Sequence, residues 1–283
     1  MINVAYYNGK IDLIENITIP LNDRAVYFGD GVYEVVYFKN GKIFALYDHL
    51  DRFYNSLRGI QIEFNKSRGE MQTLLYSLIA QLDDVSEGII YWQVSRGTAP
   101  RNHVFPNPAV EPNLLAYVKT KAAPSMDNKI KMITTEDIRF QMCNLKTINL
   151  LANLMASQKA EEAGCAEAVL HRGDIVTECS HSNISILKDG VLKTAPLTQY
   201  ILPGTVRKQL IELCNTNNIP VNETAFTLSE LMSADEVLIM STTAMIRSAC
   251  EINGEAVGGK APELLKFIQD TYIARVDAEV RAF

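Results

Sequence analysis

The chain has 283 residues, of which 47% are hydrophobic and 21% are charged, and its net charge at neutral pH is −6. This length and composition predict a globular protein with one large or two medium domains. The acidic balance, without any run of lysine and arginine, argues against nucleic acid as a partner and favours small molecules.

The cysteines and histidines indicate neither disulfides nor a metal site. The five cysteines are odd in number and far apart, so we expect reduced thiols. The histidines lack the spacing of zinc ligands, and no metal is predicted. No apolar run approaches the length of a membrane span, and the N-terminus lacks a basic segment followed by an apolar one. We therefore expect a cytoplasmic protein without a membrane partner.

The first third of the chain is predicted to form an antiparallel sheet with two helices. Asn8-Gly9 and Asn40-Gly41 each separate two extended runs, and Asn-Gly favours the positive φ angles of a type I′ hairpin. Asp48 is predicted to cap the first helix. The predicted buried face of that helix consists of Leu50, Phe53, Tyr54 and Leu57. The second helical pattern runs through Met71, Leu74, Leu75, Leu78, Ile79 and Leu82.

Two strands and a loop follow these helices. Residues 88–94 have strand composition, and residues 100–112 contain four prolines among polar residues, which is typical of a loop. After a predicted strand at 114–119, residues 121–126 are the predicted connection between domains. We thus expect an N-terminal domain at 1–120 and a C-terminal domain at 127–283.

The second half alternates helices and strands. A helix is predicted from Asn149 to Ala163 and is ended by Gly164. Its apolar stripe is formed by Leu150, Leu151, Leu154 and Met155. Strands on both sides of an Arg-Gly-Asp turn place Glu178 at a strand end. The remaining predictions are a strand pair at 183–187 and 191–193, a helix at 204–214, a buried strand at 235–240 with a turn at 241–243, and a long C-terminal helix through Leu264, Leu265, Phe267, Ile268 and Tyr272.

Three stretches of this second half carry groups that suit one cofactor. Residues 143–149 contain Lys146, residues 176–178 end in Glu178, and residues 202–207 contain a Pro-Gly-Thr turn that opens a helical pattern. An amine, a carboxylate and a helix N-terminus are what pyridoxal phosphate requires: a covalent partner, a counter-ion for the pyridinium nitrogen, and a phosphate site. Taken singly, each has a simpler interpretation as a solvated lysine, a surface glutamate or an ordinary helix start.

Together with Phe28–Val35 and Arg96–His103, the order of these stretches resembles that of the class IV (fold-type IV) pyridoxal-phosphate aminotransferases. Within this family the chain is most similar to the D-amino acid aminotransferases. The resemblance runs from about Tyr6 to the last helix. It implies an α/β (α+β) fold of two domains with the cofactor between them, and a homodimer.

The resemblance also implies roles for single residues. Lys146 would be the catalytic residue that forms the Schiff base and moves the proton, and Glu178 would keep the pyridine nitrogen protonated. The other implied cofactor-binding residues are Arg52, Ser182, Leu202, Gly204, Thr205, Val206 and Thr242. The implied substrate-binding residues are Tyr33, Arg101, His103 and Thr243. Arg101 and His103 would reach in from the neighbouring subunit.

The implied reaction is transfer of an amino group from a D-amino acid such as D-alanine to a 2-oxo acid such as 2-oxoglutarate, by a ping-pong mechanism. Arg101 and His103 favour this branch of the family, because they suit a carboxylate. Leu202-Pro203-Gly204 is more similar to the branched-chain enzymes, and His181 departs from the D-amino acid pattern. A branched-chain L-aminotransferase, an (R)-amine transaminase and an aminodeoxychorismate lyase therefore stay open, whereas Lys146 with Glu178 argues against a non-enzymatic binding protein.

Overall fold

The computed structural model describes residues 3–122 and 125–281. The chain divides into two compact units, which are described separately below. The first unit comprises Met1–Ala123, Leu145–Asn149 and Ala278–Phe283, and the second comprises Pro124–Asn144 and Leu150–Asp277. The segment 145–149, which contains Lys146, thus packs with the N-terminal part, although the predicted division assigned it to the C-terminal domain. The connection at 121–126 stays a prediction, since Ala123 and Pro124 lie outside the described residues.

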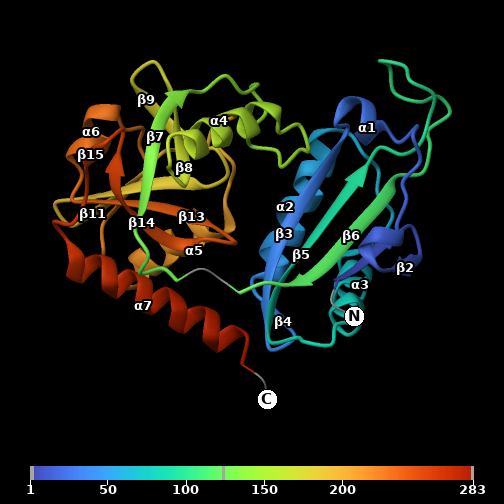
Figure 1. Ribbon diagram of the computed structural model, residues 1–283, viewed down its shortest axis with the longest axis horizontal. Coiled ribbons are helices and arrows are strands. Elements are labelled where there is room, and N and C mark those ends of the chain that lie inside the picture. Colours follow the sequence, from blue (N-terminus) through green and yellow to red (C-terminus); the bar gives the residue numbers. More distant parts are fainter. Residues whose placement is uncertain (1–2, 123–124, 282–283) are drawn as a thin grey trace. The chain divides into compact units, whose positions relative to one another are not determined.

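The first unit is a sheet with helices. Its strands are β1 (Asn3–Tyr7), β2 (Lys10–Asp12), β3 (Gly31–Lys39), β4 (Lys42–Ile43), β5 (Glu87–Ser95) and β6 (Asn113–Thr120). Its helices are η1 (Ile14–Asn16), α1 (Arg24–Phe28), α2 (Leu46–Gly59) and α3 (Arg68–Ile79). Within the described residues the six strands form one antiparallel sheet in the order β2-β1-β6-β5-β3-β4 (Figure 1).

Both predicted Asn-Gly hairpins are confirmed. Asn8 and Gly9, with φ of 44° and 100°, join β1 to β2, while Asn40 and Gly41, with φ of 52° and 71°, join β3 to β4. Positive φ at both turn positions matches the right-handed twist of the flanking strands. The local sequence therefore sets the register at both ends of the sheet.

The predicted cap of α2 is wrong. The helix begins at Leu46, before Asp48, and its N-cap is Ala45 with φ of 53° and no side-chain cap. The Ala45 N–H donates to Glu279 Oε1 at 2.8 Å, so a residue distant in sequence binds the backbone at the start of the helix. Asp48 lies in the first turn, where a carboxylate interacts favourably with the helix dipole. The predicted inward face is right, with Leu50, Phe53 and Leu57 buried and Tyr54 half-buried.

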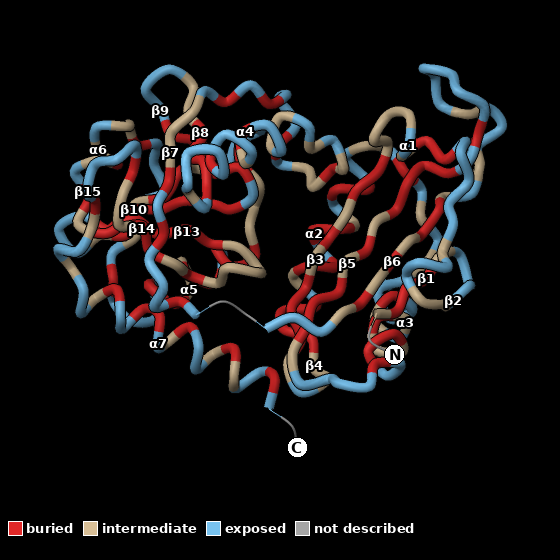
Figure 2. The backbone as a smooth tube through the Cα atoms, in the orientation of Figure 1, coloured by how far each residue is buried: buried red, intermediate tan, exposed pale blue. Residues whose placement is uncertain are grey.

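The core of the first unit lies on the face of the sheet that α2 and α3 cover. Val32, Val36 and Phe38 of β3 belong to this core, as does Trp92 of β5. Figure 2 shows buried stretches along both strands. Because strand side chains alternate, Tyr33 lies on the opposite face. There it stacks on Tyr91 with 5.6 Å between ring centroids, and Tyr91 stacks on Tyr117 at 5.1 Å. This face is therefore lined by aromatic rings.

The second unit is built on a mixed sheet. Its strands are β7 (Ile130–Glu136), β8 (Glu167–Arg172), β9 (Ile175–Cys179), β10 (Asn183–Lys188), β11 (Val191–Thr194), β12 (Val221–Asn222), β13 (Glu236–Ser241), β14 (Met245–Ile252) and β15 (Glu255–Ala256). Its helices are α4 (Leu151–Glu162), α5 (Thr205–Thr216), α6 (Leu228–Ser233) and most of α7 (Pro262–Glu279). Among the described residues the strand order is β12-β11-β10-β13-β14-β7-β8-β9, with β15 paired to β14.

Helix α4 forms as predicted, but its apolar stripe does not point into the core. Leu151, Leu154 and Met155 are 73%, 62% and 50% exposed. The buried side of the helix consists of Ala156 and Ala160, which pack against β8. Small side chains allow the helix to lie close to the sheet, so the larger ones are directed outward.

Helix α7 confirms the predicted long C-terminal helix. Leu265, Ile268 and Tyr272 are buried, whereas Phe267 is 45% exposed. Its polar face is consistent with a helix that covers a core. Among the residues that the structure describes, no helix combines the length and apolar character needed to cross a membrane.

Candidate active site

Lys146 lies in an irregular segment that pairs with the beginning of β3. Its N–H donates to Ser56 Oγ at 3.1 Å, and its carbonyl accepts from the Tyr33 N–H at 2.9 Å. Thr147 adds an antiparallel bridge to Val32. The half-buried lysine side chain places Nζ 4.2 Å from the centroid of the Tyr33 ring. Two predicted site residues, Lys146 and Tyr33, are thus in contact within the first unit.

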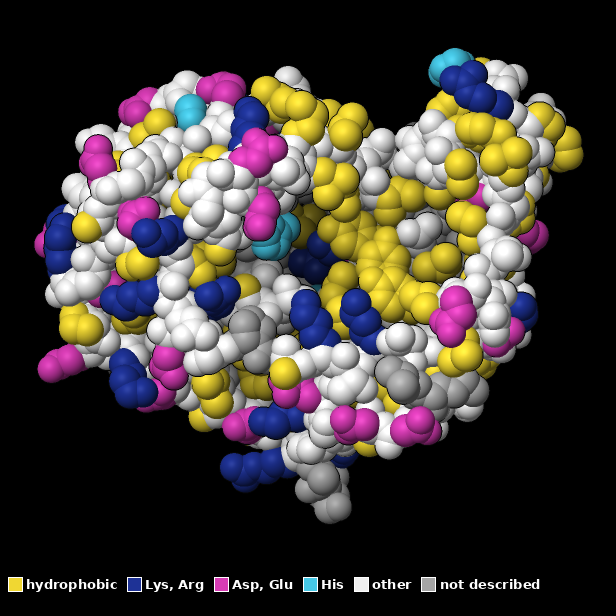
Figure 3. Space-filling model, viewed as in Figure 1, with side chains coloured by type: hydrophobic (Ala, Val, Ile, Leu, Met, Phe, Trp, Pro, Cys, Tyr) yellow, Lys and Arg dark blue, Asp and Glu magenta, His cyan; other side chains and the backbone are white. Residues whose placement is uncertain are grey.

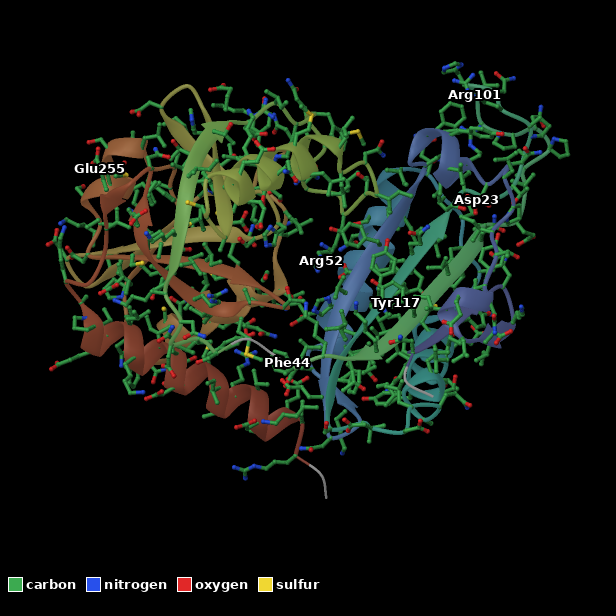
Figure 4. The ribbon with its side chains drawn as sticks, viewed as in Figure 1. Asp23, Phe44, Arg52, Arg101, Tyr117 and Glu255 are labelled. Carbon is green, nitrogen blue, oxygen red and sulfur yellow. The ribbon has the colours of Figure 1, made fainter. Side chains whose placement is uncertain are left out.

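Arg52, labelled in Figure 4, is buried on α2. It forms an ion pair with Glu34 of β3. Its Nε and Nη2 donate to the two carboxylate oxygens, each at 2.7 Å, and His49 Nδ1 donates to Glu34 Oε2 at 2.8 Å. Burial favours the protonated form of Glu34, but Arg52 and His49 outweigh it and lower the pKa of Glu34 to about 2. Burial lowers the pKa of His49. Glu34 acts in the opposite direction and would raise this pKa, whereas the charges of Arg52 and Lys146 lower it further.

The sequence did not single out Glu34 or His49. A partial signal exists, because His49 and Arg52 are three residues apart and so share one face of a helix. Nothing in the sequence indicates that Glu34 faces them, since that contact depends on how α2 packs on β3. Phosphate binding by Arg52 stays a prediction. The two hydrogen bonds from Arg52 to Glu34 fix the orientation of the Arg52 guanidinium group.

Arg101 and His103 are exposed in the loop that follows β5. Figure 4 shows Arg101 at the outer end of this loop, away from Arg52 of the same unit. Both residues lie beside Phe28, whose ring centroid is 5.3 Å from Arg101 Cζ and 5.5 Å from the His103 ring. The first unit therefore does not bring Arg101 and His103 to Tyr33 and Lys146.

In the second unit Glu178 is buried near the end of β9. Its Oε2 accepts hydrogen bonds from Asn183 Nδ2 at 2.8 Å and from the Leu202 N–H at 3.1 Å. Its Oε1 accepts a hydrogen bond from Arg139 Nη1. Burial nevertheless dominates and raises the pKa of Glu178 to about 6, with Arg139 opposing it. A buried carboxylate of this kind can hold a cationic partner at neutral pH.

Arg139, which the sequence did not reveal, is shared between two carboxylates. Besides Glu178, it donates through Nε and Nη2 to the two oxygens of Asp137, each at 2.9 Å. Asp137 Oδ2 also accepts from Thr177 Oγ1 at 3.0 Å and from Arg172 Nε at 3.2 Å. Burial disfavours the charge of Asp137, yet Arg139 outweighs burial and lowers the pKa of Asp137. The Arg139 charge is therefore only partly directed at Glu178.

Ser182 is directed at another carboxylate. Its Oγ donates to Glu167 Oε2 at 2.7 Å, and His181 Nδ1 lies 3.1 Å from the same oxygen. Burial would raise the pKa of Glu167, but hydrogen bonds from His181, Ser180 and Ser182 lower it. Contact between Ser182 and a cofactor stays a prediction, and the unusual His181 belongs to this Glu167 cluster.

The predicted phosphate site corresponds to the start of α5. Gly204 is the N-cap, and the first turn carries no acidic residue, so no carboxylate of that turn offsets the positive end of the helix dipole. A Cβ atom on Gly204 would lie 1.9 Å from Asn183 Oδ1, which explains why the position requires glycine. Thr205 and Val206 are buried in the first turn.

Thr242 and Thr243 lie apart in sequence from that helix, in the turn between β13 and β14. Both are half-buried. The turn is closed by pairing of Ser241 with Met245 and by the Ala244 N–H, which donates to Ser241 Oγ at 3.1 Å. The fold thus holds both threonines on a short, fixed turn, and their predicted contacts stay predictions.

Known proteins that are similar to this chain identify its family. The model of the family "Amino-transferase class IV" matches residues 31–252. The chain is 37% identical over 270 residues to a D-alanine aminotransferase of Staphylococcus aureus (strain MSSA476), covering 94% of this chain and 95% of that protein. It is 42% identical over 261 residues to a D-alanine aminotransferase of Listeria monocytogenes serotype 4b (strain F2365), covering 90% of each.

Solved structures show the same fold. The branched-chain aminotransferase of the thermophilic archaeon Thermoproteus uzoniensis, solved with norvaline, has a TM-score of 0.89 at 23% identity and covers 98% of this chain and 95% of that one. The branched-chain amino acid aminotransferase of Escherichia coli has a TM-score of 0.89 at 21% identity and covers 98% and 96%. The predicted fold class is confirmed. Family model, relatives and fold agree, and the chain belongs to the class IV aminotransferases.

Proposed function

We propose that this protein is a D-amino acid transaminase that uses pyridoxal phosphate and moves an amino group from a D-amino acid such as D-alanine to a 2-oxo acid such as 2-oxoglutarate. The observation that carries the proposal is the 37–42% identity to D-alanine aminotransferases over at least 90% of both chains. The branched-chain enzymes of similar structure are 21–23% identical and share the fold alone.

The residues present fit pyridoxal phosphate. Gly204 begins a helix without an acidic first turn, which suits a phosphate. Glu178 is a buried carboxylate with a pKa of about 6, so it is mostly ionised at neutral pH and suits a protonated pyridine nitrogen. Lys146 supplies the amine that the cofactor aldehyde needs. When bound, the cofactor supplies an electron-withdrawing ring that stabilises negative charge at the substrate Cα.

The chain's own residues then divide the remaining work. Lys146 Nζ would take the proton from the substrate Cα and pass it to the cofactor, and it would move a proton in the opposite direction in the second half-reaction, which requires a neutral amine. In the structure this nitrogen lies beside the Tyr33 ring. Glu178 holds a proton on the pyridine nitrogen. Arg52, oriented by Glu34, and the first amides of α5 hold the phosphate. Leu202 contributes through its N–H, which fixes the Glu178 carboxylate.

The substrate carboxylate is bound by Tyr33 together with Arg101 and His103 of a second copy of the chain. Support comes from the first unit, where both residues are exposed and Arg101 lies at the outer end of its loop (Figure 4). A homodimer follows, because each site would be incomplete without the partner. Thr242 is proposed to lie near the cofactor phosphate and Thr243 near the substrate. The proposed location of the protein is the cytoplasm.

The test compares a donor that has a carboxylate with one that lacks it. We expect Arg101→Leu to lower kcat/KM for D-alanine at least about tenfold, because a charge-assisted hydrogen bond is lost. The value for (R)-1-phenylethylamine should change much less or increase. Parallel losses for both donors, or an unaffected D-alanine rate, would remove Arg101 from substrate binding. A wild-type preference for L-leucine over D-alanine would overturn the D-amino acid assignment.

The same variant examines the partner's contribution. Lys146→Ala should by itself have almost no turnover. When the Arg101→Leu and Lys146→Ala proteins are mixed and their subunits reassociate, the mixture should show about a quarter of wild-type activity. The reason is that about half of the randomly formed dimers contain both variants, and each of these has one intact site out of two. No recovery, under conditions where the subunits exchange, would place Arg101 and Lys146 in the same chain's site.

A further inference from the structure

We propose that Arg24 is a positioning residue for substrate recognition: it fixes the loop that presents Arg101 and His103 without touching the substrate itself. This inference rests on the proposed function for its kinetic consequence, although the loop contacts are independent of it. The loop tip carries basic and histidine side chains beside hydrophobic ones in the space-filling view (Figure 3). An exposed loop of this kind needs an anchor if its side chains are to act in a defined place.

Arg24 provides hydrogen bonds to the loop backbone on both sides of His103. Its guanidinium group is buried, and Nη1 donates to the carbonyl of Asn102 at 2.8 Å and to that of Val104 at 3.3 Å. A buried charge is costly unless it is paired and hydrogen-bonded. The two carbonyls accept these hydrogen bonds only while the loop keeps this conformation. A change of the loop would therefore leave donors of the buried Arg24 without these acceptors, and this stabilises the observed loop conformation.

Asp30 links Arg24, through Arg96, to the backbone at the C-terminal end of α2. Arg24 Nε donates to Asp30 Oδ2 at 2.7 Å, and Arg96 Nε donates to the same oxygen at 2.9 Å. Arg96 in turn donates to the carbonyls of Gln61 and Ile60, each at 2.7 Å. One carboxylate thus joins the arginine under the loop to an arginine held by the end of α2.

The rings around this cluster continue the same contact. Arg24 Cζ lies 4.8 Å from the Phe28 ring centroid, and Arg101 and His103 lie beside the same ring. Arg96 Cζ is 3.5 Å from the Phe105 ring centroid. Both predicted carboxylate-binding residues therefore lie beside Phe28, a ring that Arg24 also contacts. Removing the guanidinium should loosen these residues together.

The experiment uses Arg24→Met in the holoenzyme, which keeps an unbranched side chain and removes the donors. Arg68→Met, at an exposed arginine paired with Asp51, is the matched control. Hydrogen exchange of the amides at 101–105 should accelerate about tenfold in Arg24→Met alone, with β3 and β5 unchanged. KM for D-alanine should rise at least about tenfold while kcat and the (R)-1-phenylethylamine rate change by less than about threefold. Arg24→Lys, which retains a charge for Asp30, should fall between.

The outcomes separate the two proposals. Unchanged exchange in the loop, a faster loop with an unchanged KM, or a fall in kcat for both donors would each overturn the role of Arg24. If the wild-type enzyme does not use D-alanine, the proposed function fails by itself, whereas the exchange measurement still reports whether Arg24 holds the loop.

Discussion

Each unit of the chain buries a glutamate against an arginine, and the pKa values of the two glutamates are shifted in opposite directions. Glu34 in the first unit receives two hydrogen bonds from Arg52 and one from His49, and its pKa falls to about 2. Glu178 in the second unit accepts a hydrogen bond from only one nitrogen of Arg139, and its pKa rises to about 6. Both side chains are almost fully buried.

The difference lies in how the arginine is shared. Arg52 directs two nitrogens at Glu34, whereas Arg139 directs two at Asp137 and one at Glu178. A carboxylate beside a buried arginine is therefore not always strongly acidic, because its desolvation penalty has to be offset by positive charge as well as by hydrogen bonds. In the first cluster Arg52 offsets that penalty, and we interpret the pair as a fixed support. In the second cluster Arg139 does not offset it fully, so we expect Glu178 to favour a further cationic partner.

The largest expected effect concerns the first cluster. Glu34→Gln would leave the Arg52 charge buried without a counter-ion and should lower the free energy of unfolding by about 3–5 kcal/mol. Urea denaturation of the cofactor-free protein measures it. The double variant Glu34→Leu with Arg52→Leu is the control and should regain most of the loss, because no charge stays buried. A loss below about 1 kcal/mol in Glu34→Gln would mean that the pair does not act as a buried support.

The next effect concerns the second cluster and appears in catalysis. Glu178→Gln should reduce the single-turnover rate with D-alanine about a hundredfold or more, because the pyridine nitrogen loses its ionised partner. Its stability at neutral pH should fall much less than that of Glu34→Gln, since the Glu178 charge is not favoured by its surroundings. An unchanged single-turnover rate would show that another group holds the nitrogen.

The smallest effect is the opposite pH dependence of the two sites. Because the folded-state pKa of Glu178 lies above the ordinary value of 4.5, its contribution to stability falls as pH rises from 4.5 to about 6, by about 2 kcal/mol. Glu34, with a folded-state pKa of about 2, contributes fully above pH 4.5 and loses that contribution as pH falls toward 2. Unfolding free energies of the cofactor-free wild type and each Gln variant, compared at several pH values, measure both slopes. Slopes of equal sign would contradict the comparison.

Local chemistry made several features predictable from sequence. The hairpins at Asn8-Gly9 and Asn40-Gly41 depend on two adjacent residues, and their φ angles agree with the prediction. The helices and the strand that carries Glu178 follow from short periodic patterns. Family membership was also readable, because the motifs around Lys146 and Gly204 stand in a fixed order along the chain.

The tertiary structure decided which groups meet. Ala45 is satisfied by Glu279, Arg52 by Glu34, and Glu178 by Arg139, and each of these partners comes from another element. Likewise, the exposed stripe on α4 reflects packing through alanines, which the apolar pattern concealed. A turn or a helix is set by neighbours within a few residues, so sequence suffices for it. The charge of a buried side chain depends on desolvation and on donors brought from distant segments, which only the packed chain provides.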